Sequence, residues 1–255
     1  MLCGAISKAD PVRWLLALVL AIWLPGGASA LECRVETFEE LAYSLCEVDL
    51  ARDDLRLFLN DPEGRPWGHF TRLDKQLNES GQTLVFGMNA GMYHPDRSAV
   101  GLYVETGREE KSLVLGASDS NFGMLPNGVF CIGAGEARVY ETTAFGKARP
   151  ACRFATQSGP MLVIEGALHP RFLPDSTSRY FRNGVGTSED GKTAVFVISD
   201  QSVTFHEFAR FFRDRLGLQS ALYLDGSISR LHAVPLGRSD PGFAMGPIVG
   251  VVAPQ

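Results

Sequence analysis

The sequence predicts an α+β protein: a single domain of mixed β-sheets with few flanking helices. Short apolar runs alternate along the chain with clusters of Gly, Pro, Asn and Asp, and this alternation is typical of strands joined by turns. One segment alone carries a complete set of helix signals. No internal repeat, low-complexity tract or Pro- and Ser-rich linker divides the sequence, so we expect one domain.

The first half of the chain is expected to consist mainly of strands. A turn at residues 60–64 precedes Trp67, because Pro62 fixes φ there and Gly64 supplies a positive φ. Residues 45–50 and 55–59 have β character, and the short runs at 83–88, 101–105 and 128–132 predict further strands.

The second half predicts a hairpin and then a helix. Residues 184–187 and 193–199 flank Ser-Glu-Asp-Gly, which is a hairpin signal and makes Asp190 a turn residue.

Residues 205–216 are expected to form the helix. Thr204 and Glu207 have the spacing of a capping box, in which each side chain satisfies a backbone donor at the helix start. Gly217 is expected to end the helix in the left-handed conformation. A strand at 221–224 follows.

Residues 1–30 are expected to be a cleavable signal peptide. Lys8 and Arg13 give a positive start, residues 14–24 are an unbroken apolar run, and Ala-Ser-Ala at 28–30 offers small residues to a peptidase. A membrane-spanning helix needs roughly 20 apolar residues, so this run of eleven is too short for an anchor. We therefore expect residues 31–255 to be a periplasmic or secreted domain without a stable membrane anchor after cleavage.

The charge and the motif content exclude several classes of function. The net charge is −5, and it becomes −6 when the leader removes two basic residues and one acidic residue. This acidity argues against nucleic acid and anionic membrane surfaces as main partners. No P-loop, dinucleotide fingerprint, Gly-x-Ser-x-Gly elbow or His-Glu-x-x-His motif occurs. The sequence therefore identifies no cofactor, and it leaves a divalent cation open.

Four cysteines remain once the leader has removed Cys3. An even number in an exported chain indicates two disulfides, which allows three connectivities. The pairs Cys33–Cys46 and Cys131–Cys152 each bracket a short stretch that could fold back as adjacent strands, so we predict these two bridges. Free buried thiols are the alternative. No CxxC or Cys/His zinc spacing occurs, and we expect no metal site of that kind.

Polar residues stand next to Gly at the ends of several apolar runs. Each place could be an ordinary turn. Together they offer amides and a hydroxyl that can bind sugar hydroxyls, a guanidinium that can grip an oxyanion, and a carboxylate. This set predicts a site for a polyol that carries a negative charge. The four places are Asn89-Ala90-Gly91, Gln157-Ser158-Gly159-Pro160, Arg182-Asn183-Gly184 and Asp225-Gly226-Ser227.

The order of these segments resembles the phosphodiester glycosidase family, which includes the lysosomal uncovering enzyme that trims N-acetylglucosamine from mannose 6-phosphate diesters. The resemblance is closest to an uncharacterised bacterial branch of that family. The better-known members have Asp-Gly-Gly-Gly-Ser where this chain has Asp-Gly-Ser-Ile-Ser at 225–229, and this bulkier loop bears on which substrate is admitted. The matching stretches are FGMNAGMYHPD, PNGVF, ATQSGPMLV, RNGVG and ALYLDGSIS, which together span residues 86–229.

The resemblance implies hydrolysis of the bond between the anomeric carbon of a sugar and a phosphodiester oxygen. The leaving group is a phosphate monoester, which is a weak base, so the site has to hold the phosphate and stabilise oxocarbenium-like charge. The catalytic residues implied are Asp225 as nucleophile or base and Arg182 as the phosphate ligand. The substrate-binding residues implied are Asn89 and Gln157 for sugar hydroxyls, Ser158 beside Gln157, Ser227 in support of Asp225, and His94 as an assisting acid.

Three of the candidates have a plainer interpretation as well. His94 precedes Pro95 in a loop, where a histidine is more often a structural hydrogen-bonding residue. Ser158 lacks the strand–elbow–helix context of a serine nucleophile. Asp119, in Ser-Asp-Ser-Asn, is more typical of a polar turn than of a metal ligand.

Two rival functions use the same residues. A non-catalytic domain that binds an envelope glycan would employ the Asn, Gln and Arg side chains without needing a carboxylate at Asp225. A structural envelope protein would have the four motifs only as turns. Product release from a sugar-phosphate diester separates an enzyme from the glycan-binding domain. Dependence of folding, but not of ligand binding, on the four motifs would favour the structural protein.

Overall fold

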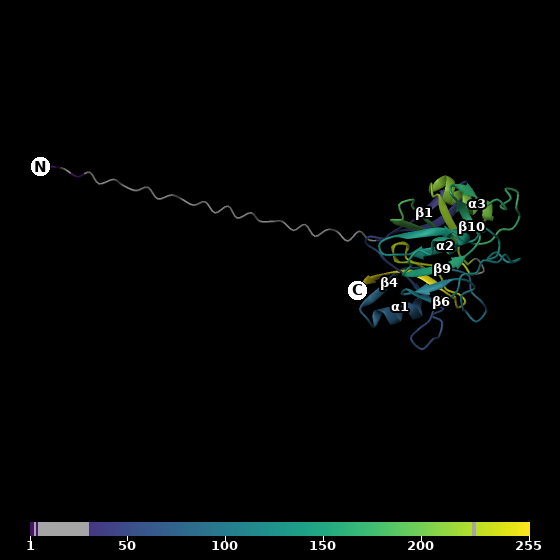
Figure 1. Cartoon of the computed structure of the whole chain (residues 1–255), viewed down its shortest axis with the longest axis horizontal. Coiled ribbons are helices and arrows are strands. Elements are labelled where there is room, and N and C mark those ends of the chain that lie inside the picture. Colours follow the sequence, from purple (N-terminus) through teal and green to yellow (C-terminus); the bar gives the residue numbers. More distant parts are fainter. Residues whose placement is uncertain (3, 5–30, 226–227) are drawn as a thin grey trace. The chain divides into compact units, whose positions relative to one another are not determined.

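The computed structural model describes residues 1–2, 4, 31–225 and 228–255. Residues 5–30 of the predicted signal peptide lie outside the described residues, and so does Ser227. Residues Leu31 to Gln255 form one compact domain. Strands predominate in the described part of this domain, and three α-helices accompany them (Figure 1).

Three sheets build the domain. The seven-stranded sheet has the order β1 (Glu32–Phe38), β2 (Leu41–Asp49), β13 (Thr193–Ser199), β12 (Asn183–Thr187), β14 (Ser220–Tyr223), β10 (Met161–Ile164), β11 (Ala167–Leu168). The second sheet has the order β16 (Arg238–Ser239), β15 (Leu231–Ala233), β4 (Gln82–Asn89), β17 (Ile248–Pro254), β3 (Asp54–Phe58). The third has the order β6 (Arg108–Lys111), β5 (Tyr103–Glu105), β9 (Phe154–Ser158), β7 (Gly128–Ile132), β8 (Ala137–Glu141).

The expectation of mixed sheets is wrong, because every strand pairing in the described chain is antiparallel. Parallel neighbours need a long crossover connection, usually a helix. Here tight turns join successive strands: Glu39 and Glu40 connect β1 to β2 with positive φ, and Ser188 to Gly191 connect β12 to β13. The described residues remain compatible with the α+β class, although the domain is largely β.

The central strands of the seven-stranded sheet are buried on both faces. One face belongs to the main core, which also takes apolar side chains from the other two sheets. The opposite face packs against α3 (Phe205–Arg210) and the π-helix that follows it (Phe211–Arg215). The second sheet is covered by α1 (Phe70–Asn78). Figure 1 shows α1 and α3 on opposite sides of the strands. Burial on both faces explains why β13 has an unbroken apolar run from Ala194 to Ile198.

The predicted helix begins as expected and ends differently. The capping box is present, since Glu207 N–H donates to Thr204 Oγ1 (3.1 Å) and Thr204 N–H donates to Glu207 Oε2 (2.8 Å). Gly217 has the predicted left-handed conformation, with φ of 68°. The last turn is a π-helix in which the Leu216 N–H reaches Phe211 O. This wider turn accompanies the burial of Phe211 against Tyr43, with ring centroids 4.0 Å apart.

The sequence did not reveal α1 or α2 (Thr142–Ala148). The first residue before α1 is His69, whose side chain makes no capping bond, so the usual start signal is missing. Burial of Phe70, Leu73 and Leu77 stabilises this helix instead. Its existence is therefore a tertiary effect.

Both predicted disulfides are confirmed in the structure. Cys33 and Cys46 face each other on β1 and β2, with a Cα–Cα distance of 4.1 Å. Cys131 on β7 pairs with Cys152, which lies just before β9, at 5.5 Å. Each bridge closes a short loop between neighbouring strands.

Replacing Cys33 and Cys46 together by Ser should lower the stability measurably. A bridge that closes a loop of this length stabilises by about 3 kcal/mol in the chain-entropy model, which corresponds to a melting temperature roughly 6–12 °C lower for a domain of this size. Thermal unfolding measures the effect. Non-reducing peptide mapping of the wild type is the control, and peptides joined as Cys33–Cys131 would contradict the pairing.

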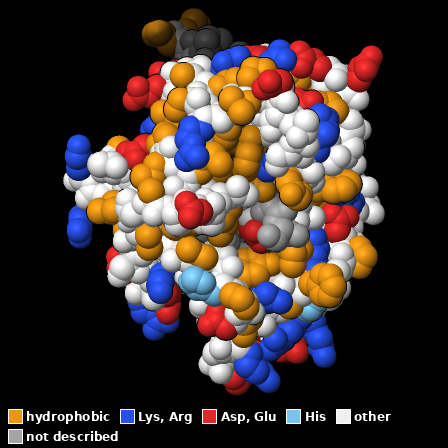
Figure 2. Space-filling view, turned by 90° about the vertical axis from the view of Figure 1, so that its right-hand side faces the viewer, with side chains coloured by type: hydrophobic (Ala, Val, Ile, Leu, Met, Phe, Trp, Pro, Cys, Tyr) orange, Lys and Arg blue, Asp and Glu red, His pale blue; other side chains and the backbone are white. Residues whose placement is uncertain are grey.

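No helix among the described residues is long and apolar enough to cross a bilayer. On the face shown in Figure 2, hydrophobic side chains are exposed between charged side chains of both signs. The exposed large hydrophobic residues include Tyr180, Phe181 and Phe243, each with more than half of its surface accessible. Two of them directly precede Arg182 in the sequence.

Candidate functional site

Three of the four polar segments meet where the first two sheets join. Asn89 ends β4, Asn183 begins β12, and Asp225 follows β14. The Asn89 Nδ2 group donates to the backbone O of Asp225 (2.8 Å) and to Asn183 Oδ1 (3.1 Å). Asn183 Nδ2 returns a bond to Asn89 O (3.0 Å), and Asp225 N–H donates to Ala90 O (3.1 Å). The backbone at Asp225, which follows a strand of the first sheet, is therefore fixed to the end of β4 in the second sheet.

The fourth segment reaches the same place through Gly91. A Cβ at Gly91 would lie 2.6 Å from Gln157 O on β9 and would also clash with the Thr156 side chain. The chain after Asn89 can pack this closely on β9 because residue 91 has no side chain. All four segments that the sequence singled out are thus connected.

Asp225 is nearly buried and lies close to two tyrosines. Burial, together with the negative charge of Asp225, raises the pKa of Tyr93 to about 12. Burial also raises the pKa of Tyr223 to about 12, and there Arg182 opposes the effect of Asp225. Both hydroxyls are therefore protonated at neutral pH and can donate hydrogen bonds. The Tyr93 hydroxyl is buried beside Asp225, whose charge and hydrogen-bonding side chain both raise the pKa of Tyr93.

Arg182 occupies an aromatic cage beside Tyr223. Its Nε donates to Val203 O (2.9 Å) and its Nη2 to Ser178 O (3.2 Å). The guanidinium carbon lies 3.6 Å from the ring centroid of Phe205, a cation–π contact. Burial lowers the pKa of Arg182, and the side chain is 1% exposed. Arg182 and Asp225 thus both act on the pKa of Tyr223, in opposite directions.

A family model described as phosphodiester glycosidase matches residues 82–243, well over half of the chain. This chain belongs to the phosphodiester glycosidase family. The resemblance that the motifs indicated is confirmed, and the matched region contains all four segments of the site.

A bacterial relative has a similar sequence along most of its length. The uncharacterized protein YigE of Escherichia coli (strain K12) is 33% identical over 220 residues, which are 86% of this chain and 84% of YigE.

Several solved structures have a similar fold. The catalytic domain of zebrafish N-acetylglucosamine-1-phosphodiester alpha-N-acetylglucosaminidase, auto-inhibited by its pro-peptide, has a TM-score of 0.55 at 14% identity, covering 87% of this chain and 81% of that one. A hypothetical protein from Synechocystis has a TM-score of 0.58 at 12% identity, covering 88% and 62%. A protein from Burkholderia pseudomallei K96243 that is described as exported has a TM-score of 0.53 at 13% identity, covering 83% and 74%. At these identities the likeness shows the fold alone.

The amide side chains of two predicted substrate-binding residues form hydrogen bonds within the protein itself. Gln157 Oε1 accepts from the N–H groups of Leu102 and Val114, and its Nε2 donates to Val114 O and Thr142 Oγ1. Asn89 uses its amide N–H groups as described and accepts the Arg230 N–H at Oδ1 (2.9 Å). In this structure both amides position segments around the site, and their contact with sugar hydroxyls stays a prediction.

The other predicted residues are distributed differently. Ser158 Oγ is buried without a hydrogen-bond partner in the described part of the chain. His94 is exposed in the loop between Tyr93 and Ala99. Ser227 lies outside the described residues. Asp190 is confirmed as a turn residue, since it accepts from Ser188 Oγ and Lys192 N–H.

Arg230 is a site residue that sequence reasoning missed. It is 4% exposed, and its backbone is attached to Asn89 Oδ1. Its charge lowers the pKa of Tyr93, the same group on which Asp225 acts in the opposite direction. The one signal in the sequence was a lone Arg between Ser229 and the apolar Leu231 at the start of β15.

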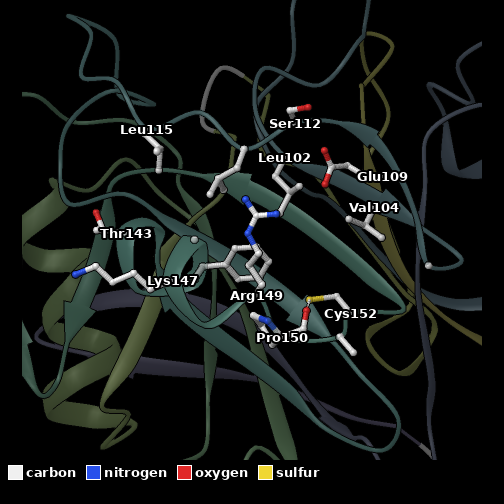
Figure 3. Close-up of a pocket in the computed structure, with 15 residues that line it drawn as sticks. Leu102, Val104, Glu109, Ser112, Leu115, Thr143, Lys147, Arg149, Pro150 and Cys152 are labelled. Atoms are coloured by element: carbon white, nitrogen blue, oxygen red, sulfur yellow. Dashed lines mark hydrogen bonds between the residues drawn. The ribbon is translucent and has the colours of Figure 1, made fainter.

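A cavity of about 980 Å³ lies elsewhere, between the loop after β6 and helix α2. Its wall is mainly apolar, with Leu102, Val104 and Phe145, and Figure 3 shows Arg149 among the side chains at its centre. The residues that line this cavity do not include Asn89, Gln157, Arg182 or Asp225. Among the described residues, no group of three or more His, Cys, Asp or Glu side chains is arranged to hold a metal ion.

Proposed function

We propose that this protein is an exported hydrolase that cleaves the glycosidic bond of a sugar-1-phosphodiester. The observation that carries the proposal is the rigid presentation of Asp225 beside two protonated tyrosines, at the junction of the four family segments. Family membership supplies the reaction class. A periplasmic or secreted location agrees with the signal-peptide pattern and with two disulfides, which persist in oxidising compartments.

Asp225 is proposed to act as nucleophile or as general base for water. The departing phosphate monoester needs little protonation, so the main task is to stabilise charge in the transition state. Tyr93 and Tyr223 can donate to oxygens of the phosphate, because each keeps its proton at neutral pH. Arg182 offsets the negative charge of Asp225 across Tyr223 and is proposed as a positioning residue as well as the predicted phosphate ligand.

Replacing Arg182 by Lys should weaken substrate binding at least about tenfold, or roughly 1.4 kcal/mol. An ammonium is a point charge and cannot donate to two carbonyls while its plane stacks on Phe205. Substrate affinity measures the effect. Arg179→Lys is the matched control, because Arg179 is more exposed and pairs with Glu207 at the surface. An affinity within about twofold of wild type would remove Arg182 from the substrate site.

A panel of sugar-1-phosphodiesters tests the proposal itself. The panel should include an N-acetylglucosamine-1-phosphodiester, which the zebrafish protein is named for, and diesters of other sugars. Release of free sugar and phosphate monoester by the mature wild type supports a hydrolase. Saturable binding of the same compounds without product release would favour the rival, an envelope glycan-binding domain.

A further inference from the structure

The guanidinium of Arg230 is a buried cation that lacks an acidic partner among the described residues. Arg230 is 4% exposed, and its Nη2 atom is buried without a hydrogen-bond partner in that part of the chain. The ion pairs between described residues do not include it. Burial lowers the pKa of Arg230, so the charged form is held at a cost.

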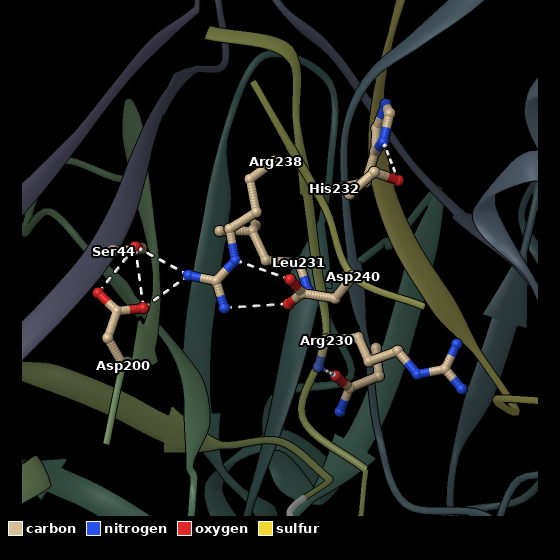
Figure 4. Close-up of polar contacts among 9 residues, drawn as sticks. Ser44, Asp200, Arg230, Leu231, His232, Arg238 and Asp240 are labelled. Carbon is tan, nitrogen blue, oxygen red and sulfur yellow. Dashed lines mark hydrogen bonds and ion pairs between the residues drawn. The ribbon is translucent and has the colours of Figure 1, made fainter. Parts of the chain in front are cut away.

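Asp240, whose charge acts on Arg230, is already paired with another arginine. Asp240 accepts from Arg238 Nε (2.9 Å) and Nη2 (3.0 Å), and it also accepts the Leu231 N–H (2.9 Å). Arg238 in turn donates to Asp200 (2.6 Å). Figure 4 shows this network on one side of the strand and the Arg230 side chain extending to the other side. Asp240 is therefore engaged by Arg238, and Arg230 makes no direct ion pair with an acid among the described residues.

The surroundings hold the Arg230 side chain in place without neutralising it. A Cβ at Gly242 would lie 3.0 Å from Nε and 3.1 Å from Cζ and Nη2, so the backbone of this loop lies against the guanidinium. Gly242 has φ of 142°, which L side chains rarely adopt. Tyr93 is close enough to both Arg230 and Asp225 for each charge to shift its pKa. A group bound at Arg230 is consequently near the proposed reacting carboxylate.

The geometry points to Arg230 as the residue that binds the anionic part of the substrate, with a phosphate group as its ligand. A buried charge without a partner destabilises a protein unless a ligand supplies the opposite charge. A guanidinium matches a tetrahedral phosphate through two parallel N–H···O bonds. The Tyr93 hydroxyl, which is buried there and kept protonated beside Asp225, adds a neutral donor. This inference rests on the proposed function for the identity of the anion.

Binding of inorganic phosphate to the mature protein tests the inference without any hydrolysis. Wild type should bind phosphate in a saturable way by calorimetry and should melt at a higher temperature when phosphate is present. Arg230→Met should lose at least about tenfold in phosphate affinity, and the shift in melting temperature should disappear. Arg230→Lys should retain part of the affinity, because it keeps the charge but not the fork.

The melting temperature without phosphate gives a second readout. Met has a similar length and no charge, so Arg230→Met should melt at or above the wild-type temperature. A purely structural Arg230 would instead make this variant less stable. Arg108→Met is the matched control for loss of one positive charge, since Arg108 is 79% exposed and pairs with Glu110; its phosphate affinity should equal that of wild type.

Two results would overturn the inference: absence of saturable phosphate binding by wild type, or unchanged phosphate affinity in Arg230→Met. If Arg230→Met does not fold, Arg230→Lys decides, and wild-type affinity in that variant counts against the role. A wild type that binds phosphate through Arg230 but hydrolyses no diester would contradict the proposed function alone. Hydrolysis that is unaffected by Arg230→Met would contradict this inference alone.

Discussion

Asp225→Asn should abolish hydrolysis while the fold stays intact. The replacement is nearly isosteric, and the backbone bonds from Asp225 to Asn89 and Ala90 do not depend on the side chain. Only the charge and basicity are removed, and loss of a general base alone usually costs roughly 10²–10⁴ in rate. The variant should melt like wild type, bind a non-hydrolysable diester and turn over poorly. Initial rates on the diester that wild type cleaves measure the effect.

Asp190→Asn is the matched control for that experiment. Asp190 also precedes a Gly, but it lies in the turn after β12 and accepts from Ser188 Oγ and Lys192 N–H. An Asn oxygen can accept the same bonds, so full activity is expected. If Asp225→Asn keeps most of its activity as well, Asp225 is a turn residue and its catalytic assignment is wrong.

Asn89→Ala should destabilise the domain strongly. Its amide group connects Asp225, Asn183 and Arg230, and the side chain is completely buried. Removal leaves buried donors and acceptors without partners, which costs about 3 kcal/mol or more. The melting temperature should therefore fall by roughly 6–12 °C, as measured by thermal unfolding.

Asn121→Ala provides the comparison, because Asn121 is exposed and its loss should change the melting temperature little. Activity should be lost together with stability in Asn89→Ala, since the backbone of Asp225 loses its support. A variant that melts like wild type but no longer binds the substrate would instead favour the original prediction, in which Asn89 holds a sugar hydroxyl.

Features encoded by neighbouring residues were predictable. The capping box of Thr204 and Glu207 and the turn at Asp190 depend on contacts within a few positions. The disulfide partners are separated by 13 and 21 residues, so adjacent strands could bring them together. Helix α1 escaped detection because its N-cap carries no side-chain bond and its stability comes from burial of one face.

The roles of the site residues required the tertiary structure. The sequence alone determined the family, the exported character that we expect, and which four segments carry polar groups next to Gly. It did not reveal that the Asn89 amide is consumed by partners as far as 141 residues away, or that Gln157 bonds to Val114 across 43 residues.

Arg230 illustrates the physical reason most clearly. An arginine can form a structural ion pair or remain available to bind a ligand. Which of the two occurs depends on whether the nearby acids are already paired with other basic residues. Asp240 is ten positions from Arg230 in the sequence, yet it pairs with Arg238, which itself contacts Asp200 on the next sheet. The sequence motifs indicated which segments contribute residues to the site. Only the packing of two sheets decided which of their charges remained uncompensated.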